Sequence, residues 1–186
     1  MSKVALSGNA SGTGTFTIAS PNSNTDRTLT LPDATGTILT TATPGVPVNG
    51  PAFSAFATVN QSFTSNTFTK VTFPSEEFDT NSCYDTTLYR FTPTVAGYYE
   101  VAVSLSMSST VTLLNAIVYK NGTAFKGASN VASTATSFTT QANAMVYLNG
   151  STDYIEAYIY ATGTSPILSA GSVYSFFQAF LARSAT

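Results

Sequence analysis

The 186-residue chain has only 9% charged residues, with 7 basic and 9 acidic side chains and no histidine, where a typical soluble domain has about a quarter charged residues. The basic residues are scattered singly, so no basic patch is present to neutralise nucleic-acid phosphates or an anionic membrane surface. The missing histidine excludes Ser-His-Asp and Cys-His catalysis and histidine zinc sites, while the 43% hydrophobic content suits a globular protein.

The start of the chain and its single cysteine lead to two further expectations. Residues 1–8 lack the apolar core of a secretory signal, and no apolar run is long enough to cross a bilayer. We therefore expect a protein made in a host cytoplasm, without a signal peptide or membrane insertion. Cys83 cannot form an internal disulfide, and with no histidine to activate it we expect an inert thiol.

Residues 1–44 are interpreted as an amino-terminal β-rich arm, whose part from 12 to 41 has short alternating runs separated by turn clusters. Strands this short need neighbours from the rest of the chain or from other copies. Thr-Leu-Thr-Leu-Pro at residues 28–32, followed by a turn and Gly36-Thr37, resembles a module of bacteriophage tail-fibre and other virion proteins. The resemblance implies that the arm attaches to a virion or to a neighbouring fibre subunit. The alternative is a flexible linker.

The boundary of the second domain is expected where turn-forming residues concentrate. Residues 43–51 contain three prolines and two glycines, a composition that breaks both helices and sheet ladders. We assign residues 45–51 to a linker and residues 52–186 to a carboxy-terminal head. The first strand of the head is expected at residues 52–56.

Residues 73–99 carry aromatic and turn residues at spacings that strand propensity alone does not produce. The residues of this ladder are Phe73, Asp79, Tyr84, Phe91, Gly97 and Tyr99. The ladder resembles the signature of the globular head of complement component one-q, a trimeric jelly roll related to tumour necrosis factor. Aromatic residues usually stand two and four positions after the family's tyrosine, where this chain has Val101 and Val103. The resemblance implies a jelly-roll β-sandwich over residues 51–183 and a homotrimer.

The same stretch can also be interpreted without the family. From Tyr99 to Met107, apolar residues recur at every second position, which is the period of a strand with one face in the core. Gly97 follows Pro93 where the chain must turn sharply, and we expect backbone angles there that exclude a side chain. The ladder residues are therefore interpreted as core and turn residues rather than ligand contacts.

Turn chemistry delimits the later strands. Residues 113–120 end at Asn121-Gly122, which favours a two-residue hairpin turn, and residues 138–148 end at Asn149-Gly150. Strands are also predicted at residues 69–73 and 154–160. No segment has a helical period or a capping box before an apolar run, so the predicted fold is all-β.

The last predicted strand, residues 173–181, has apolar side chains on both faces and must therefore be covered twice. Its phrase from Ser175 to Leu181 resembles the Ser-Phe-x-Gly-Phe-Leu phrase that ends the head of the resembled family, with Ala179 in place of the glycine. In that family this strand lies between the core and the threefold axis. The resemblance makes three residues candidates for the trimer interface: Phe176, Phe177 and Phe180.

The carboxylates that could act as acid and base, or bind a cation, lie in one window: Glu76, Glu77, Asp79 and Asp85. Two carboxylates on a β-scaffold can hydrolyse glycosides, and several relatives of the resembled family bind calcium near the trimer axis. Nothing else converges on this window to perturb its pKa values, and its spacing matches no known ion-binding loop. We expect a solvated acidic loop, no enzyme and no cofactor; calcium binding is the alternative.

One strand suggests what the head binds. Tyr154, Tyr158 and Tyr160 alternate with apolar residues, so all three lie on one predicted face, where aromatic planes can pack on sugar rings. On a surface rich in hydroxyl and amide groups, these tyrosines are candidate contacts for a host-surface glycan. The alternative places them in the trimer interface or against the second sheet.

Together these features predict a non-enzymatic bacteriophage virion protein, a tail fibre or similar appendage, whose trimeric head binds the host surface. Other virion proteins would bind the arm. The alternative is a capsid decoration, cement or head-fibre protein that binds the capsid through the arm and does not need the head for attachment. The sequence alone does not separate the two.

Overall fold

The computed structural model describes residues 50–131 and 138–185, together with residues 11–15, 17, 19, 22–26 and 28 of the arm. The chain divides into two compact units, Met1–Thr37 and Ile38–Thr186. Most of the short strands expected in the arm, and residues 45–49 of the expected linker, lie outside the described residues, so both stay predictions.

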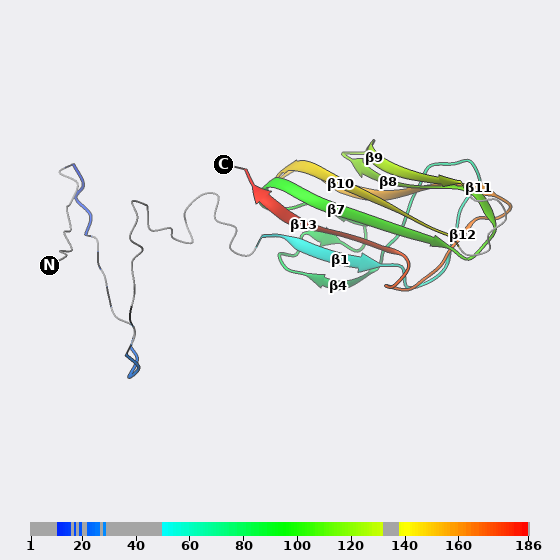
Figure 1. The fold of residues 1–186 in the computed structure, drawn as a ribbon. Helices are drawn as coiled ribbons and strands as arrows, with labels where there is room; N and C mark the ends of the chain where they lie inside the picture. The colour runs from blue at the N-terminus through cyan, green and yellow to red at the C-terminus, as the bar shows by residue number, and fades with distance from the viewer. Residues whose placement is uncertain are drawn as a thin grey trace. The chain divides into compact units, whose positions relative to one another are not determined.

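The second unit contains two antiparallel sheets and, among its described residues, no helix (Figure 1). The main strands of sheet A are, in order, β4 (Ser75–Asp79), β1 (Ala52–Phe56), β13 (Phe176–Ser184), β7 (Ala96–Met107) and β10 (Phe138–Asn149), with β12 (Ile167–Leu168) and β2 (Gln61–Ser62) following from β7. Sheet B contains β5 (Tyr84–Asp85), β6 (Arg90–Phe91), β11 (Ile155–Gly163), β8 (Val111–Lys120) and β9 (Thr123–Val131), and β3 (Thr69–Lys70) also pairs with β11. The predicted all-β class is confirmed.

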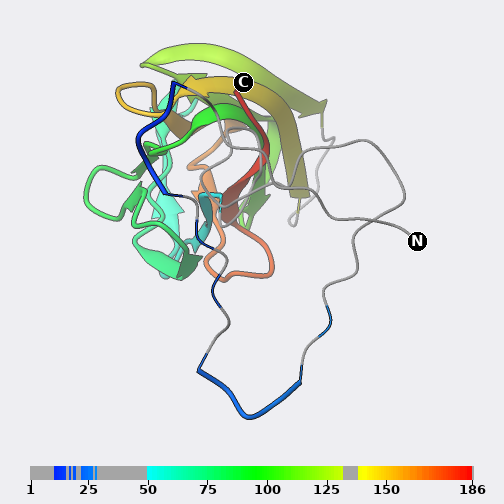
Figure 2. The same cartoon turned by 90° about the vertical axis from the view of Figure 1, so that its left-hand side faces the viewer.

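The core lies between the two sheets, which Figure 2 views along their strands. On β7 the alternating residues from Tyr99 to Met107 are fully buried, as their period predicted. On β10 every second residue from Thr140 to Leu148 is buried in the same way. These two strands pair along their whole length, so they supply one continuous wall of the core.

The aromatic residues of the ladder meet around Phe53, which is fully buried on β1. Its ring stacks on Tyr84 and Phe91, with centroid distances of 4.7 and 4.6 Å, and meets Phe177 edge-on at 4.9 Å. The Tyr84 hydroxyl donates to the Phe73 carbonyl at 3.0 Å, so its polar end is satisfied inside the core. The ladder therefore joins residues from both sheets.

The polar members of the ladder hold backbone groups in place. The Asp79 carboxylate accepts hydrogen bonds from the backbone N–H groups of Tyr84 at 2.8 Å and Asn81 at 3.3 Å, which closes the connection from β4 to β5. The Tyr99 hydroxyl donates to the Val95 carbonyl at 2.7 Å. Burial raises the pKa of both Tyr84 and Tyr99, so both phenols stay protonated hydrogen-bond donors.

Gly97 is needed for a reason different from the one that the sequence suggested. It lies inside β7 and is not among the residues with positive φ, so its backbone angles do not exclude a side chain. A Cβ at Gly97 would instead clash with the carbonyl oxygen of Arg183 and lie 2.6 Å from Cδ1 of Leu181. The close approach of β13, at the irregularity between Leu181 and Arg183, therefore requires glycine.

We expect Gly97→Ala to lower the free energy of unfolding by about 1 to 3 kcal/mol, because the added methyl group overpacks the contact between β7 and β13. Thermal or urea unfolding at one fixed protein concentration measures the change. A loss below about 0.5 kcal/mol would show that β13 moves away from β7 at little cost.

The hairpin turn predicted at Asn121-Gly122 is confirmed. Both residues have positive φ, 51° and 75°, and the turn joins β8 to β9 with Lys120 opposite Thr123. Gly150 also has positive φ, 73°, directly after β10. Each turn allows the next strand to return along the sandwich.

Candidate functional site

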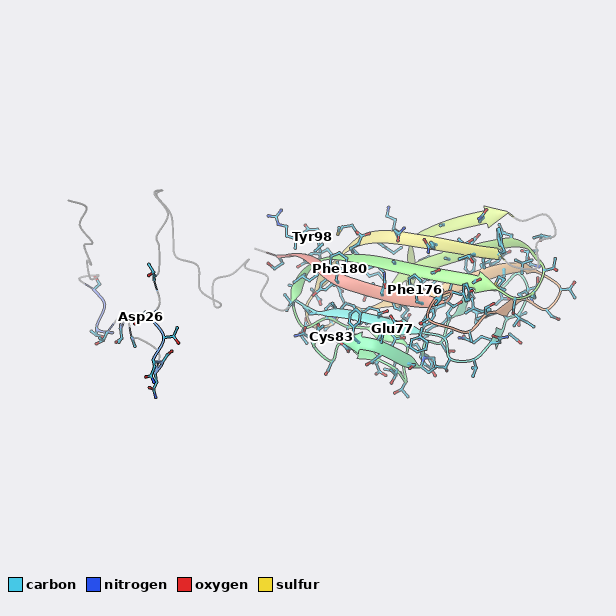
Figure 3. All side chains as sticks on the ribbon, turned by 60° about the horizontal axis from the view of Figure 1, so that its bottom comes forward. Asp26, Glu77, Cys83, Tyr98, Phe176 and Phe180 are labelled. Carbon is cyan, nitrogen blue, oxygen red and sulfur yellow. The ribbon has the colours of Figure 1, made fainter. Side chains whose placement is uncertain are left out.

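The outer face of sheet A, which points away from the core, carries large apolar side chains exposed by 42 to 53%. These are Phe78, Tyr98, Met145, Tyr147 and Phe180. They come from four different strands, and Figure 3 shows Tyr98, Phe180 and the neighbouring Phe176 following one another along this face. An apolar patch drawn from four strands is typical of a surface that another molecule covers.

The strand register brings these side chains together. Phe180 on β13 lies opposite Glu100 on β7, and Glu100 lies opposite Met145 on β10. Tyr98 lies opposite Tyr147, and the two rings meet edge-on with a centroid distance of 5.5 Å. The outer face of sheet A therefore has an apolar row crossing β13, β7 and β10 with one carboxylate in it.

A hollow of about 170 Å³ opens beside Phe180 on the same face. Its outward-facing lining comes from Ala52, Phe78, Glu100, Ala102, Gln178 and Phe180. Because its lining combines small residues with the aromatic rings of Phe78 and Phe180, the hollow can receive an apolar side chain from a second molecule.

A loop of the head itself covers the part of sheet A farthest from the start of β1 and the end of β13. The Ser104 hydroxyl donates to the Tyr174 carbonyl at 3.0 Å, and the Ser106 N–H donates to the Ser175 hydroxyl at 3.3 Å. Both serines are buried although they share the outward side of β7. The uncovered apolar row consequently lies nearer to the end of the head where β1 begins and β13 ends (Figure 1).

Of the three candidates for the trimer interface, two reach this face. Phe180 is 53% exposed and Phe176 is partly buried. Phe177 is different: its side chain is fully buried among Phe53, Phe73 and Tyr84, so its placement at an interface was wrong. Alternation along β13 points Phe177 into the core when Phe176 points outward.

The acidic window is not the loop that the sequence suggested. Glu76, Glu77 and Asp79 lie on β4, which is the edge strand of sheet A, and Asp85 lies on β5. The Glu77 carboxylate accepts from the Ser54 hydroxyl at 2.9 Å, and Asp85 accepts from two backbone N–H groups at 2.8 Å. Charged side chains on an edge strand oppose pairing with strands of other molecules, which gives this window a structural role.

The pKa values of the window follow from these contacts. The backbone hydrogen bonds from Leu88 and Thr87 hold the pKa of the Asp85 carboxyl below its usual value. Partial burial and the nearby Asp79 raise the pKa of Glu76. Among the described residues, no group of three or more His, Cys, Asp or Glu side chains converges as a metal site would require.

Of the three tyrosines expected to contact a ligand, Tyr158 and Tyr160 lie on β11 and Tyr154 lies directly before it, and intramolecular neighbours cover much of all three rings. Tyr158 stacks on Tyr119 with a centroid distance of 3.7 Å, and Arg90 lies 4.9 Å over the ring of Tyr154. Tyr160 packs against Phe68 at 4.7 Å, and Phe68 is the more exposed of the two rings. The sequence missed Phe68 because it lies in a loop without strand alternation.

A partly buried ion pair lies beside Tyr158. Glu156 is 5% exposed, and its carboxylate accepts from the Lys70 ammonium at 2.6 Å. Lys70 also donates to the Leu88 carbonyl at 3.1 Å. Burial, followed by the charge of Glu156, raises the pKa of Tyr158. The charges are thus neutralised within sheet B.

Two comparisons with known proteins found no match: no protein-family model and no curated protein matches the chain. Solved structures do match. The globular domain of zebrafish complement 1qA protein is 17% identical with a TM-score of 0.58, over 73% of this chain and 99% of that one. Murine APRIL is 10% identical with a TM-score of 0.57, over 70% and 98%. Eiger TNF from S. frugiperda is 10% identical with a TM-score of 0.57, over 73% and 96%.

The head has the complement one-q and tumour necrosis factor jelly-roll fold. This confirms, at the level of the fold, the resemblance carried by residues 73–99. At such low identities the similarity of the complement one-q-like head to these structures establishes architecture alone. No helix in the part of the chain that the structure describes could span a membrane.

Proposed function

We propose that the chain is a non-enzymatic bacteriophage virion protein, a tail fibre or similar appendage, whose complement one-q-like head forms a homotrimer and binds the host surface. The observation that carries the proposal is the uncovered outer face of sheet A. Phe180, Met145 and Tyr98 expose large apolar surfaces there, next to a hollow of about 170 Å³. A second and a third copy of the chain are suitable partners for this apolar face, because only 9% of the residues in each copy are charged.

A homotrimer accounts for this face better than a small ligand does. The apolar row crosses three neighbouring strands, which gives it the breadth of a protein interface rather than of a pocket. Interfaces of obligate oligomers resemble a domain core cut in half, with aromatic residues and methionine enriched at their centre. Phe180, Met145 and the Tyr98–Tyr147 pair fit that composition.

The arm supports the proposed virion context. The missing histidine and the hydrogen bonds of the acidic side chains support the proposal that the chain is not an enzyme. The arm carries Thr-Leu-Thr-Leu-Pro at residues 28–32, followed by Gly36-Thr37, as in the virion modules that it resembles. The whole sequence has no histidine, and Asp79 and Asp85 accept backbone hydrogen bonds. These carboxylates therefore support the fold instead of facing a substrate.

Multi-angle light scattering of the full-length chain tests the assembly. We expect a mass three times the 19.4 kDa of one chain, unchanged on dilution to micromolar concentration. A stable monomer would contradict the trimer. Gold-labelled antibody against the head, imaged on intact particles, tests the location: label on a tail appendage supports the proposal, and label spread over the capsid supports a decoration protein.

A further inference from the structure

A second hollow lies among three described connecting segments, at the end of the head opposite the start of β1 and the end of β13 (Figure 1). They are residues 63–68 between β2 and β3, residues 108–110 between β7 and β8, and residues 164–166 between β11 and β12. The hollow has a volume of about 530 Å³. Its described lining consists of Ser65, Thr110, Thr112, Thr162, Gly163 and Thr164.

The chemistry of this lining is uniform. Every described lining residue except Gly163 carries a hydroxyl group, and none carries a charge. Within the part of the chain that the structure describes, neither Thr110 nor Thr164 makes a side-chain hydrogen bond, and both are exposed. Hydroxyl groups both donate and accept, so they complement a neutral ligand that itself carries hydroxyls.

An aromatic surface is connected to the hollow through Asn66. The Asn66 side-chain oxygen accepts from the Thr162 hydroxyl at 2.9 Å and from the Tyr160 hydroxyl at 3.3 Å. The Tyr160 ring in turn packs against Phe68, which is 54% exposed. An exposed ring beside a set of hydroxyls matches a sugar, whose C–H faces pack on aromatic rings while its own hydroxyls form hydrogen bonds.

The segments around the hollow are fixed by their own hydrogen bonds. The N–H of Asn66, a residue with φ of 61°, donates to the Ala161 carbonyl at 2.9 Å. The Gly163 N–H donates to the Ser65 hydroxyl at 3.1 Å, and a Cβ at Gly163 would lie only 2.7 Å from the carbonyl oxygen of Thr110. A ligand that binds here therefore does not have to order the loops, which lowers the entropic cost of binding.

We propose that this hydroxyl-lined hollow, together with Phe68 and Tyr160, binds a neutral carbohydrate. The assignment rests on the proposed host-binding role of the head and names its ligand class and its site. The site lies at the end of the head away from the start of β1 and the end of β13, and its described lining residues all come from one chain. The sequence had placed the sugar contacts on Tyr154, Tyr158 and Tyr160, of which only Tyr160 belongs to this site.

The test measures binding of the full-length chain to immobilised neutral polysaccharides (a glucan, a mannan and a galactan) and to a polyuronate as the anionic counterpart. We expect binding to at least one neutral polymer, with an affinity that changes less than about twofold between low and high salt, because no ion pair contributes. Phe68→Ala should weaken that binding at least about tenfold, as the loss of an aromatic anchor does. Thr164→Val, which removes one hydroxyl at nearly constant volume, should weaken it several-fold.

Phe125→Ala is the matched control, because Phe125 is 39% exposed on β9 and does not line the hollow. It should bind as the unchanged chain does. Binding to none of the neutral polymers, binding to the polyuronate alone, or equal binding by the Phe68 and Phe125 variants would overturn the proposal. Light scattering on the same samples distinguishes the carbohydrate site from the proposed trimer. A trimer that binds no neutral polymer refutes the carbohydrate site alone. A monomer that binds a neutral polymer refutes the trimer alone.

Discussion

Phe91→Ala should lower the free energy of unfolding of the head by about 3 to 5 kcal/mol, the range measured when a buried phenylalanine is truncated. Phe91 is fully buried on β6. Its ring stacks on Phe53 at 4.6 Å and meets Tyr99 edge-on at 5.6 Å. The substitution removes the ring of sheet B on which Phe53 and Tyr99 of sheet A pack, and the surrounding strands cannot close the resulting cavity.

Urea unfolding followed by fluorescence or circular dichroism measures this loss. Protein concentration must be the same for all variants, because the stability of an oligomer depends on it. Phe125→Ala removes the same side chain from an exposed position and should change stability by less than about 0.5 kcal/mol. A loss below about 1 kcal/mol for Phe91→Ala would mean that the core rearranges around the missing ring.

The strands that the sequence predicted best are those whose pattern needs no knowledge of a partner. Alternation from Tyr99 to Met107 identified the core face of β7, and Asn121-Gly122 located the hairpin between β8 and β9. Both are local signals, since side-chain period and turn angles depend on neighbouring residues in the chain. These local signals were enough to predict the all-β class of the fold.

Features that depend on which strands become neighbours could not be predicted in the same way. Gly97 is required by the approach of Arg183, which lies 86 positions later in the chain. The inward face of β13 was ambiguous because Phe176 and Phe177 are adjacent and both apolar. The pairing of β13 with β1 and β7 determines which of the two side chains faces the core, because it places Phe177 between Ala55 and Val103.

For the candidate binding residues, too, the local pattern was predictable but the contacts with distant segments were not. Alternation correctly placed Tyr158 and Tyr160 on one face of β11, where both are partly buried. That Tyr119 would stack on Tyr158, and that Phe68 would pack on Tyr160, depends on β8 and on the segment before β3. The hydroxyl-lined hollow likewise brings together threonines of β8 and β11 with residues of the connections around them, and none of these segments has a motif of its own.

Phe180→Glu should convert the proposed trimer to a folded monomer and raise the concentration at which it dissociates at least about a hundredfold. Phe180 is 53% exposed in the single chain, so the substitution costs the fold little. In the assembly the introduced carboxylate would be buried. It would also lie beside Glu100, which is opposite Phe180 on β7, so that two like charges would share the hollow on the outer face of sheet A.

Sedimentation velocity over a range of concentrations measures the dissociation, and far-ultraviolet circular dichroism shows that the variant keeps its strands. Phe125→Glu places the same charge on β9 of sheet B and should leave the trimer intact. A double variant, Phe180→Glu with Glu100→Gln, should recover part of the affinity, because one of the two like charges is gone. If Phe180→Glu stays trimeric at the lowest concentration, the outer face of sheet A is not the interface between copies.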